Sequence, residues 1–598
     1  QLCAYVVADK PLTVSELRGR LSQEMPGYMI PSYFVQLEKM PLTANGKTDR
    51  KALPAPEGSV NTGAEYTAPR TPLEEQLVRI WQEVLGTERI GVKDNFFDLG
   101  GHSLRATALA SKLYKEMKVN LPLRDVFRLP TIEEMAKAIA DMAQTTYASI
   151  PAVEERAYYP LSSAQKRLYI LHQLEGAEQS YNMPEFMTLE GPLNRERFEE
   201  SFRKLIARHE ILRTGFEMVH GEPVQRVHAQ VEFEVEYGQA DEEEVEDIVR
   251  GFVRTFDLKH PPLLRVELVE LEPERHLLMV DMHHLISDGV SMGILVDEWS
   301  RLYAGEELPP LRIQYKDFAV WQQHEAQRER MNKQEGYWLQ AFEGELPVAD
   351  LPTDYERPSV RSFEGAHVEF EVDSELARQL NQLASTRGST LYMVLLSAYN
   401  VLLSKYSGQK DIIVGTPVAG RTHPDLEPLL GMFVNTLAIR NYPAGDKTFA
   451  SFLEEVKETT LGAFEHQDYP FEELVERLDV KRDASRNPVF DTMFVMQNTE
   501  DREARFEALH LTPYVLDHTN DAKFDLSLFV AEDNGVITGG FQYCAKLFKP
   551  AMIHKMLKDF LFVLSQICED PNIPLNQIQC HAPSASRKGS LEDIEFAF

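Results

Sequence analysis

The residues best suited to chemistry are His283, His284 and Asp288, which follow an apolar, strand-like run at residues 277–280. A glycine ends their loop before a helical pattern that begins at about Ser291. A strand that delivers histidines into such a loop can hold an imidazole rigidly at a cleft. Because the unperturbed pKa of histidine is about 6.5, this imidazole can accept a proton from an attacking nitrogen near neutral pH.

Two other interpretations of the histidine pair compete with this one. Two histidines at the end of a strand can form a packed, hydrogen-bonded pair in the core, with no chemical role. A metal site is disfavoured, because adjacent residues of a strand point to opposite sides and no further cysteine or histidine lies at metal-motif spacing. The residues themselves therefore leave a proton acceptor and a packed pair open.

Ser103 is a second candidate for chemistry, because Gly100 and Gly101 allow a tight turn just before it. The apolar positions that follow are typical of a helix, so we expect Ser103 to be exposed at a helix N-terminus. Free amide groups and the helix dipole favour a phosphate there, which suits a phosphodiester. A helix-capping serine is the alternative, but it does not explain the neighbouring Phe96 and Phe97.

Helix start signals on both sides of Ser103 predict a small helical bundle. Thr71 is a capping threonine, Pro72 follows at the first helical position, and a glutamate comes three residues after the cap. Apolar residues then keep helical spacing until Gly86, and the same start signal returns at Thr131. A bundle of about seventy residues supports a core only if its helices pack closely.

The length of the chain indicates several domains, because 598 residues exceed the size at which a single core stops growing. In the N-terminal region we expect a small α/β piece with strands at residues 3–7 and 33–37 and a helix at about 14–23. In the largest unit, strand-like runs alternate with helical patterns, which predicts mixed α/β layers. The predicted divisions are 1–54, a linker at 55–70, a helical unit at 71–142, a linker at 143–157, a large unit at 158–581 with subdomains at about 158–335 and 336–581, and a tail at 582–598.

Composition argues against several classes of function. There are 62 Lys and Arg against 94 Asp and Glu, and the net charge of −32 disfavours nucleic acid as a partner. The 4 cysteines have no CxxC spacing, so we expect neither a zinc site nor a disulfide framework. No apolar run approaches the ~18 residues of a membrane span, and no signal peptide is visible. We expect a cytoplasmic protein without a membrane partner, cut from a longer polypeptide.

Residues 94–104 resemble the phosphopantetheine attachment signature of carrier proteins, in the peptidyl carrier form of non-ribosomal peptide synthetases. The resemblance implies that a phosphopantetheinyl transferase attaches 4'-phosphopantetheine covalently to Ser103. Residues 25–31 and 42–50 resemble the last two signatures of adenylation domains. This likeness implies that Lys47 contacts an acyl adenylate, where a cation suits the developing negative charge. The body of that domain would lie upstream of this chain, so we expect no activation by Lys47 here.

The stretch around His283, His284 and Asp288 resembles the His-His-x-x-x-Asp-Gly signature of condensation domains. By this resemblance His284 is the essential histidine, His283 has mainly a packing role, and Asp288 pairs with a buried arginine, for which we expect Arg421. Arg167, in the first motif of the family, is expected to give structural support. Matching motifs follow the family order at residues 163–169, 208–216, 315–321, 431–437, 466–472 and 482–488.

These resemblances imply a multidomain fold: a small α/β adenylation remnant, a four-helix-type carrier bundle, and an α/β condensation domain of two chloramphenicol-acetyltransferase-like subdomains. They imply peptide-bond formation, with the thioester on Ser103 as donor and a downstream carrier as the source of the acceptor. His284 would act as a general base on the α-amine or as a hydrogen-bonding group that orients it, and both options stay open.

An epimerization-type domain and a catalytically silent carrier-docking module are the alternatives. The motifs at residues 208–216 and 431–437 fit a condensation domain better than an epimerization domain. A heterocyclization domain would have aspartate in place of the two histidines. We therefore expect an L-configured donor and an L-configured acceptor. Besides the downstream carrier, the expected partners are an upstream adenylation domain body and a phosphopantetheinyl transferase, and the fragment itself is expected to be a monomer.

Overall fold

The structure, a computed structural model, describes residues 3–7, 33–37, 66–87, 89–140, 142, 148–173, 179–480, 483–497, 506, 508–514, 521–533 and 535–580. In the N-terminal region, β1 (Cys3–Val7) pairs in parallel with β2 (Tyr33–Leu37), at the two predicted strands. Lys47, the helix expected at residues 14–23 and the expected tail lie outside the described residues.

The helical unit around Ser103 forms as its start signals predict. The Thr71 hydroxyl caps the first helix by accepting a hydrogen bond from the Glu74 amide at 3.1 Å, and Gly86 ends that helix with φ at 68°. The rings of Trp81 and Phe96 meet edge to face in its core, 5.0 Å apart. Its described helices are α2 (Pro72–Leu85), α3 (Ser103–Lys112), a short π-helix η2 (Leu113–Met117), α4 (Leu123–Arg128) and α5 (Ile132–Ala140).

The first half of the large unit is built on a sheet with the strand order β14-β4-β9-β8-β7, and a smaller sheet has the order β3-β6-β5. Its elements are β3 (Tyr159–Pro160), α6 (Ser163–His172), β4 (Asn182–Glu190), α7 (Arg195–Arg208), η3 (Glu210–Arg213), β5 (Thr214–Val219), β6 (Glu222–Val227), β7 (Glu236–Gln239), η4 (Glu242–Glu244), α8 (Val245–Phe252), β8 (Leu264–Glu272), β9 (Arg275–His283), α9 (Gly289–Ala304), α10 (Tyr315–Gln322) and α11 (Glu325–Ala341).

The second half contains a mixed sheet with the order β10-β16-β15-β13-β11-β12. The helix α13 is buried on all sides from Leu391 to Leu403, in keeping with the mainly apolar sequence of that stretch. The elements are β10 (Gly365–Val372), α12 (Ser374–Thr386), α13 (Leu391–Ser407), β11 (Ile412–Val418), η5 (Pro424–Leu426), β12 (Asn435–Asn441), α14 (Phe449–Glu465), α15 (Phe471–Arg477), β13 (Thr492–Gln497), β14 (His510–Pro513), β15 (Leu526–Asp533), β16 (Val536–Cys544) and α16 (Pro550–Glu569).

The two halves share a strand. The short β14 comes from the second half of the sequence, but it pairs antiparallel with β4 at the edge of the first sheet. A strand of so few residues carries too little alternation to be recognised in sequence, so the predicted division at about 335/336 does not anticipate this exchange. The crossing ties the two halves together.

The strand β9 positions the histidines. It lies between β4 and β8 and is buried along almost its whole length, which accounts for its continuous apolar run. The helix expected from about Ser291 begins earlier, at Gly289, because the Asp288 carboxylate caps it by accepting a hydrogen bond from the Ser291 amide at 2.8 Å. The loop after His283 is therefore held between a buried strand and a capped helix.

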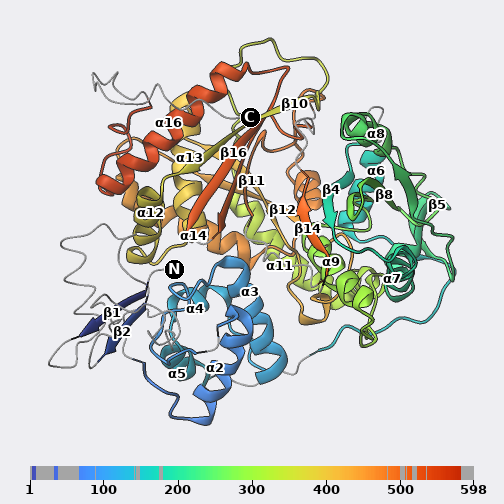
Figure 1. Cartoon of the computed structure of the whole chain (residues 1–598). Coiled ribbons are helices and arrows are strands. Elements are labelled where there is room, and N and C mark those ends of the chain that lie inside the picture. The colour runs from blue at the N-terminus through green and yellow to red at the C-terminus, as the bar shows by residue number, and fades with distance from the viewer. Residues whose placement is uncertain are drawn as a thin grey trace, which may run out of the picture.

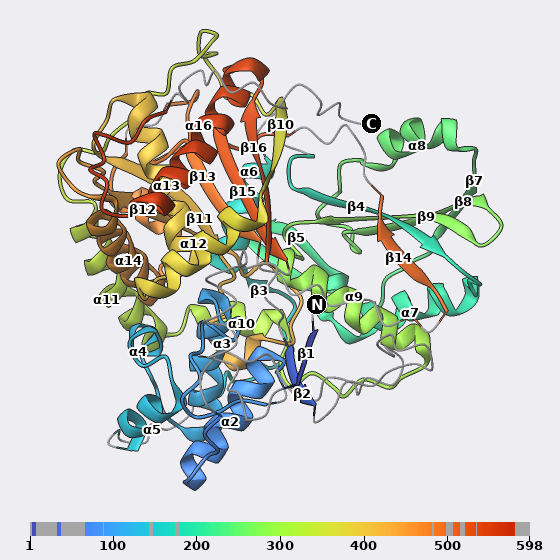
Figure 2. The ribbon, with the colours of Figure 1, turned by 60° about the vertical axis from the view of Figure 1, so that its left-hand side comes forward.

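The helical unit lies against the second half of the large unit, below it in Figures 1 and 2, where α4 packs on α14. Arg124 of α4 forms ion pairs with Glu458 at 2.8 Å and with Glu465 at 3.4 Å. The Ser385 hydroxyl of α12 donates a hydrogen bond to Asp98 at 3.1 Å, just ahead of the glycine turn. These contacts are half-exposed and polar.

Candidate active site

His284 lies in the turn after β9, and one of its two ring nitrogens already forms a hydrogen bond within the protein. Its Nδ1 lies 2.8 Å from the carbonyl oxygen of Ser287, which can only accept a hydrogen bond, so Nδ1 carries the proton. The backbone amide of His284 donates to the carbonyl of Tyr181 at 2.8 Å. Burial, helped by the positive charge of Lys523, lowers the pKa of His284 to about 4. The ring is therefore neutral at pH 7, with Nε2 as its hydrogen-bond acceptor.

His283 has the surroundings of a core residue and is 0% exposed. Its Nδ1 accepts a hydrogen bond from the Leu285 amide at 3.1 Å, and its Nε2 lies 3.3 Å from Nδ1 of His172. Burial lowers the pKa of His283 to about 3. The packed-pair interpretation thus fits the environment of His283, whereas His284 faces a cavity.

Asp288 and Arg421 meet in the interior of the protein. Their side chains are 3.2 Å apart and only 0% and 6% exposed. The second oxygen of the carboxylate accepts a hydrogen bond from the Phe433 amide at 2.9 Å. The guanidinium also donates to the carbonyls of Leu426 and Leu429, both at 2.7 Å. The structure thus brings together the pair expected from sequence, and the pair fixes the loop after His284 to the second half.

The segment that carries Arg421 needs a glycine in front of it. Gly420 has φ at 65°, and a Cβ atom there would lie 1.8 Å from the carbonyl oxygen of Phe433. This close approach lets the guanidinium lie over the Phe433 ring, 4.1 Å from its centre. The backbone geometry at Gly420 therefore aims Arg421 at Asp288.

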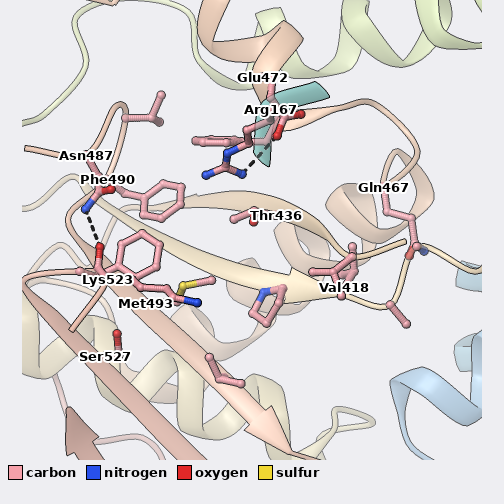
Figure 3. Close-up of a pocket in the computed structure, with 18 of the residues that line it drawn as sticks. Arg167, Val418, Thr436, Gln467, Glu472, Asn487, Phe490, Met493, Lys523 and Ser527 are labelled. Carbon is pink, nitrogen blue, oxygen red and sulfur yellow. Dashed lines mark hydrogen bonds and ion pairs between the residues drawn. The ribbon is translucent and has the colours of Figure 1, made fainter. Parts of the chain in front are cut away.

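Arg167 also links the two halves, as the expected structural support. From α6 it forms an ion pair with Glu472 of α15 at 3.2 Å, and its guanidinium lies 5.6 Å from the centre of the Phe471 ring. Figure 3 shows this pair in the wall of the cavity. Because both side chains are about one-third exposed, the attraction contributes only about 0–1 kcal/mol.

Ser103 is the first residue of α3, and His102, not Ser103, is the N-cap. Gly100 has φ at 92°, and a Cβ atom on Gly101 would lie 2.3 Å from the Phe96 ring, so both glycines are needed for the turn. The Ser103 hydroxyl is shielded from solvent and has no hydrogen-bond partner among the described residues. The expectation of an exposed serine is wrong: Ser103 is half-buried, because α3 faces the large unit.

The surroundings of Ser103 fit a phosphodiester to phosphopantetheine. An unused hydroxyl stands at the N-terminus of α3, where backbone N–H groups and the helix dipole favour a phosphate. Ser103 is also one of the residues that line a cavity large enough for a long arm. The capping alternative does not fit, because the cap position belongs to His102.

One cavity of about 2880 Å³ extends from the helical unit to the histidine loop. Its wall includes Ser103 and Leu104 of α3 as well as His284, Arg421 and Lys523 of the large unit. Ligand pockets for small molecules are typically ~300–1,000 Å³, so this space suits a long, flexible ligand. The site that could carry an arm and the histidine that could assist an amine therefore line the same half-open cavity.

Figure 3 also shows a wall residue that sequence reasoning missed, Lys523. Its backbone carbonyl accepts a hydrogen bond from the Asn487 side chain at 3.2 Å, and its ammonium lies 5.4 Å from the centre of the Tyr181 ring. Lys523 comes shortly before the buried strand β15. A charged residue at the entrance to a buried strand is the signal that could have revealed it.

Within the part of the chain that the structure describes, no group of three or more His, Cys, Asp or Glu side chains is placed to hold a metal ion. No helix in that same part is long and apolar enough to cross a membrane. Cys544, Cys568 and Cys580 are free thiols. None of these three cysteines lines the large cavity.

Comparisons with known proteins agree with this arrangement. Residues 155–588 match the condensation domain, and residues 75–139 match the phosphopantetheine attachment site. The chain is 52% identical to bacitracin synthase 3 of Bacillus licheniformis and 53% identical to tyrocidine synthase 3 of Brevibacillus parabrevis, in each case over 96% of its own length. It spans only 9% of the length of each of these relatives.

Solved structures show the same fold. The X-domain from teicoplanin biosynthesis is 26% identical with a TM-score of 0.67, over 72% of this chain and 100% of that chain. A four-domain nonribosomal peptide synthetase bound to AMP and glycine is 23% identical with a TM-score of 0.65, over 73% of this chain and 35% of that chain. The predicted α/β condensation fold is thereby confirmed, and the chain belongs to the condensation domain family, with a phosphopantetheine attachment domain in front of it.

Proposed function

We propose that this chain forms peptide bonds in non-ribosomal peptide synthesis. The large unit transfers the acyl group of a thioester held at Ser103 to the amine of an amino acid on a downstream carrier. The observation that carries this proposal is the single cavity with Ser103 and His284 in its wall. An arm attached to Ser103 can then reach the histidine without leaving the protein surface.

Ser103 is the attachment site for phosphopantetheine. The group, when bound, supplies a thiol on a long arm that carries the acyl chain as a thioester. A phosphopantetheinyl transferase is needed to attach it, and the body of an upstream adenylation domain is needed to load it. Residues 42–50, including Lys47, would belong to that upstream domain.

His284 orients the attacking amine. With Nδ1–H bound to Ser287, Nε2 offers its lone pair to an N–H of the amine. An α-ammonium group has a pKa near 8, far above the value of about 4 for His284, so the ring cannot deprotonate it beforehand. The amine arrives unprotonated and is held by Nε2. It gives up its proton as the new C–N bond makes the nitrogen acidic.

Asp288, Arg421 and Arg167 support the site and do not touch the substrate. The ion pair of Asp288 with Arg421 keeps the turn of His284 in place across the two halves. Arg167 and Glu472 link the halves again on another side of the cavity. His283 contributes by packing against His172.

The donor and the acceptor are L-configured in this proposal, since the sequence shows condensation motifs and no epimerization domain follows the helical unit. Epimerization of the donor is the second candidate reaction, and chiral analysis of the product distinguishes the two. We also propose that the reaction takes place in the cytoplasm and that the fragment is a monomer. A downstream carrier is the partner that supplies the acceptor.

The test charges the chain on Ser103 with an aminoacyl-phosphopantetheine and mixes it with a separate, loaded acceptor carrier. Mass spectrometry of the acceptor measures dipeptide formation in a single turnover. We expect product from the parent and no measurable product from His284→Ala, whereas the exposed His260→Ala serves as a control with parental rates. Equal product from the parent and His284→Ala would overturn the assignment of His284.

A further inference from the structure

We propose that Lys523 is a catalytic residue whose ammonium donates a hydrogen bond to the carbonyl oxygen of the acyl group being transferred. The inference rests on the peptide-bond-forming function proposed above and adds a role that neither the motifs nor the histidine loop assign. Lys523 lines the same cavity as His284 and is exposed within it. Both residues therefore border the space that a thioester substrate would occupy.

Tyr181 connects Lys523 to His284. Its carbonyl accepts the backbone N–H of His284 at 2.8 Å, and its ring lies 5.4 Å from the ammonium of Lys523. On the other side, the Asn487 amide holds the backbone of Lys523 at 3.2 Å. The lysine is thus anchored at its backbone and steadied by an aromatic face, with its charged end beside the histidine turn.

The ammonium of Lys523 is available for a substrate. Within the described residues it forms no hydrogen bond or ion pair with another side chain, in contrast to Arg167, which is paired with Glu472, and Arg361, which donates to Asn487. The surrounding walls of the cavity partly desolvate the ammonium and so lower the pKa of Lys523, as does Arg167, while Asp521 raises it. An unpaired cation in a substrate cavity gains a partner when negative charge develops there.

The proposed step balances without any further reactant. The amine nitrogen attacks the thioester carbon, a C–N bond forms, and the π electrons of the carbonyl move to oxygen. When the C=O bond re-forms, the C–S bond breaks and sulfur leaves as a thiolate. The proton that the amine passes to Nε2 of His284 then goes to this thiolate. Lys523 keeps its own proton, and its hydrogen bond strengthens while the oxygen carries negative charge.

Lys523 also acts on the charge state of His284. The ionisable groups that interact electrostatically with His284 are Lys523, Asp288 and the neighbouring His283, and Tyr181 contacts it through its backbone carbonyl. Lys523 lowers the pKa of His284 and Asp288 raises it, while burial keeps Tyr181 neutral by raising its pKa. Loss of the lysine charge therefore raises the pKa of His284, which reports that the ammonium lies close enough to the histidine to act on its charge.

The experiment measures single-turnover dipeptide formation by the full chain, loaded on Ser103, between pH 5 and 9. We expect Lys523→Met to slow transfer by about 10²–10³-fold, the usual cost of removing one donor to a developing oxyanion. Lys523→Arg keeps a donor, so we expect it to stay within about tenfold of the parent. In Lys523→Met the protonation of His284 moves to higher pH, seen by NMR of the ring.

Thermal melting reports folding, and Lys523→Gln gives a second neutral variant of similar length. Lys558→Met, at an exposed position of α16, is the matched control with parental rates. Parental transfer by a folded Lys523→Met or Lys523→Gln variant would overturn the proposal, as would equal losses in folded Lys523→Arg and Lys523→Met. Failure of the parent chain to transfer would instead overturn the proposed function, so the two results are distinguishable.

Discussion

Ser103 and His284 share one cavity, but the regions that carry them are held in opposite ways. The turn of His284 follows a buried strand and is fixed by the buried ion pair of Asp288 with Arg421. Ser103 stands in a small helical unit whose described ion pairs with the large unit, those of Arg124, are half-exposed. The turn of His284 is fixed by a buried ion pair, whereas the ion pairs of the helical unit are accessible to solvent.

The energies of half-exposed and buried ion pairs differ, and this difference has a consequence for the mobility of the two regions. Exposed ion pairs contribute about 0–1 kcal/mol each, so a unit held by a few of them can leave and return. Removal of one member of a buried, hydrogen-bonded pair costs about 3–5 kcal/mol, so the histidine turn cannot rearrange without loss of stability. We infer that the carrier region exchanges between partners while the reaction site stays preformed.

The largest expected effect is at Ser103, since the arm has a single point of attachment. Ser103→Ala should take up no phosphopantetheine when the chain is treated with coenzyme A and a phosphopantetheinyl transferase. Ser111→Ala is the matched control, because the Ser111 hydroxyl lies on the same helix and also has no partner among the described residues. Intact-mass spectrometry reads the result, and a mass gain in Ser103→Ala would contradict the account.

The second largest effect concerns the buried ion pair that fixes the turn of His284. Arg421→Ala leaves the Asp288 carboxylate buried without its cation, and we expect the free energy of unfolding of the large unit to fall by about 3–5 kcal/mol. Arg195→Ala removes a half-exposed ion pair with Glu270 and should cost only about 0–1 kcal/mol. Denaturant unfolding measures the free energy of unfolding of both variants. Equal losses would show that the buried pair stabilises the fold no more than the half-exposed pair does.

A smaller effect follows from the buried His283. Its pKa is lowered to about 3 in the folded protein and is near 6.5 when unfolded, so between these values the unfolded chain binds more protons. Stability conferred by the neutral ring is present above pH 6.5 and declines as the pH falls toward 3. From pH 7 to 5.5, His283→Gln should lose about 1 kcal/mol less stability than the parent. Identical pH slopes in denaturant unfolding would contradict this.

The smallest effect concerns the half-exposed ion pairs between the helical unit and the large unit. Arg124→Glu places like charges opposite Glu458 and Glu465, and we expect transfer from Ser103 to slow by about fivefold or less at low salt. High salt should remove the difference. Arg128→Glu, on the exposed side of the same helix, is the matched control and should transfer at the parental rate. A loss of a hundredfold would mean that the unit is held far more firmly than its contacts indicate.

The sequence patterns predict the helices and strands of this molecule more accurately than they predict the tertiary contacts between them. The capping signal at Thr71 and the apolar run of β9 each predict the right element, because both signals depend only on neighbouring residues. The pairing of β14 with β4 was not foreseen, since register across such a separation leaves no local signal. The sequence marks Lys523 only as a charged residue ahead of a buried strand, and the folded chain is needed to place it in the wall of the same cavity as His284.

In the function proposed above, an arm on Ser103 reaches His284 through the shared cavity. The direct measurement loads Ser103 with a pantetheine analogue that ends in a bromoacetyl group and maps the alkylated residue by peptide mass spectrometry. We predict one intramolecular link, to Nε2 of His284, with none to the buried His283 and none in His284→Ala. A link to a residue outside the cavity, or no intramolecular link at all, would contradict the account.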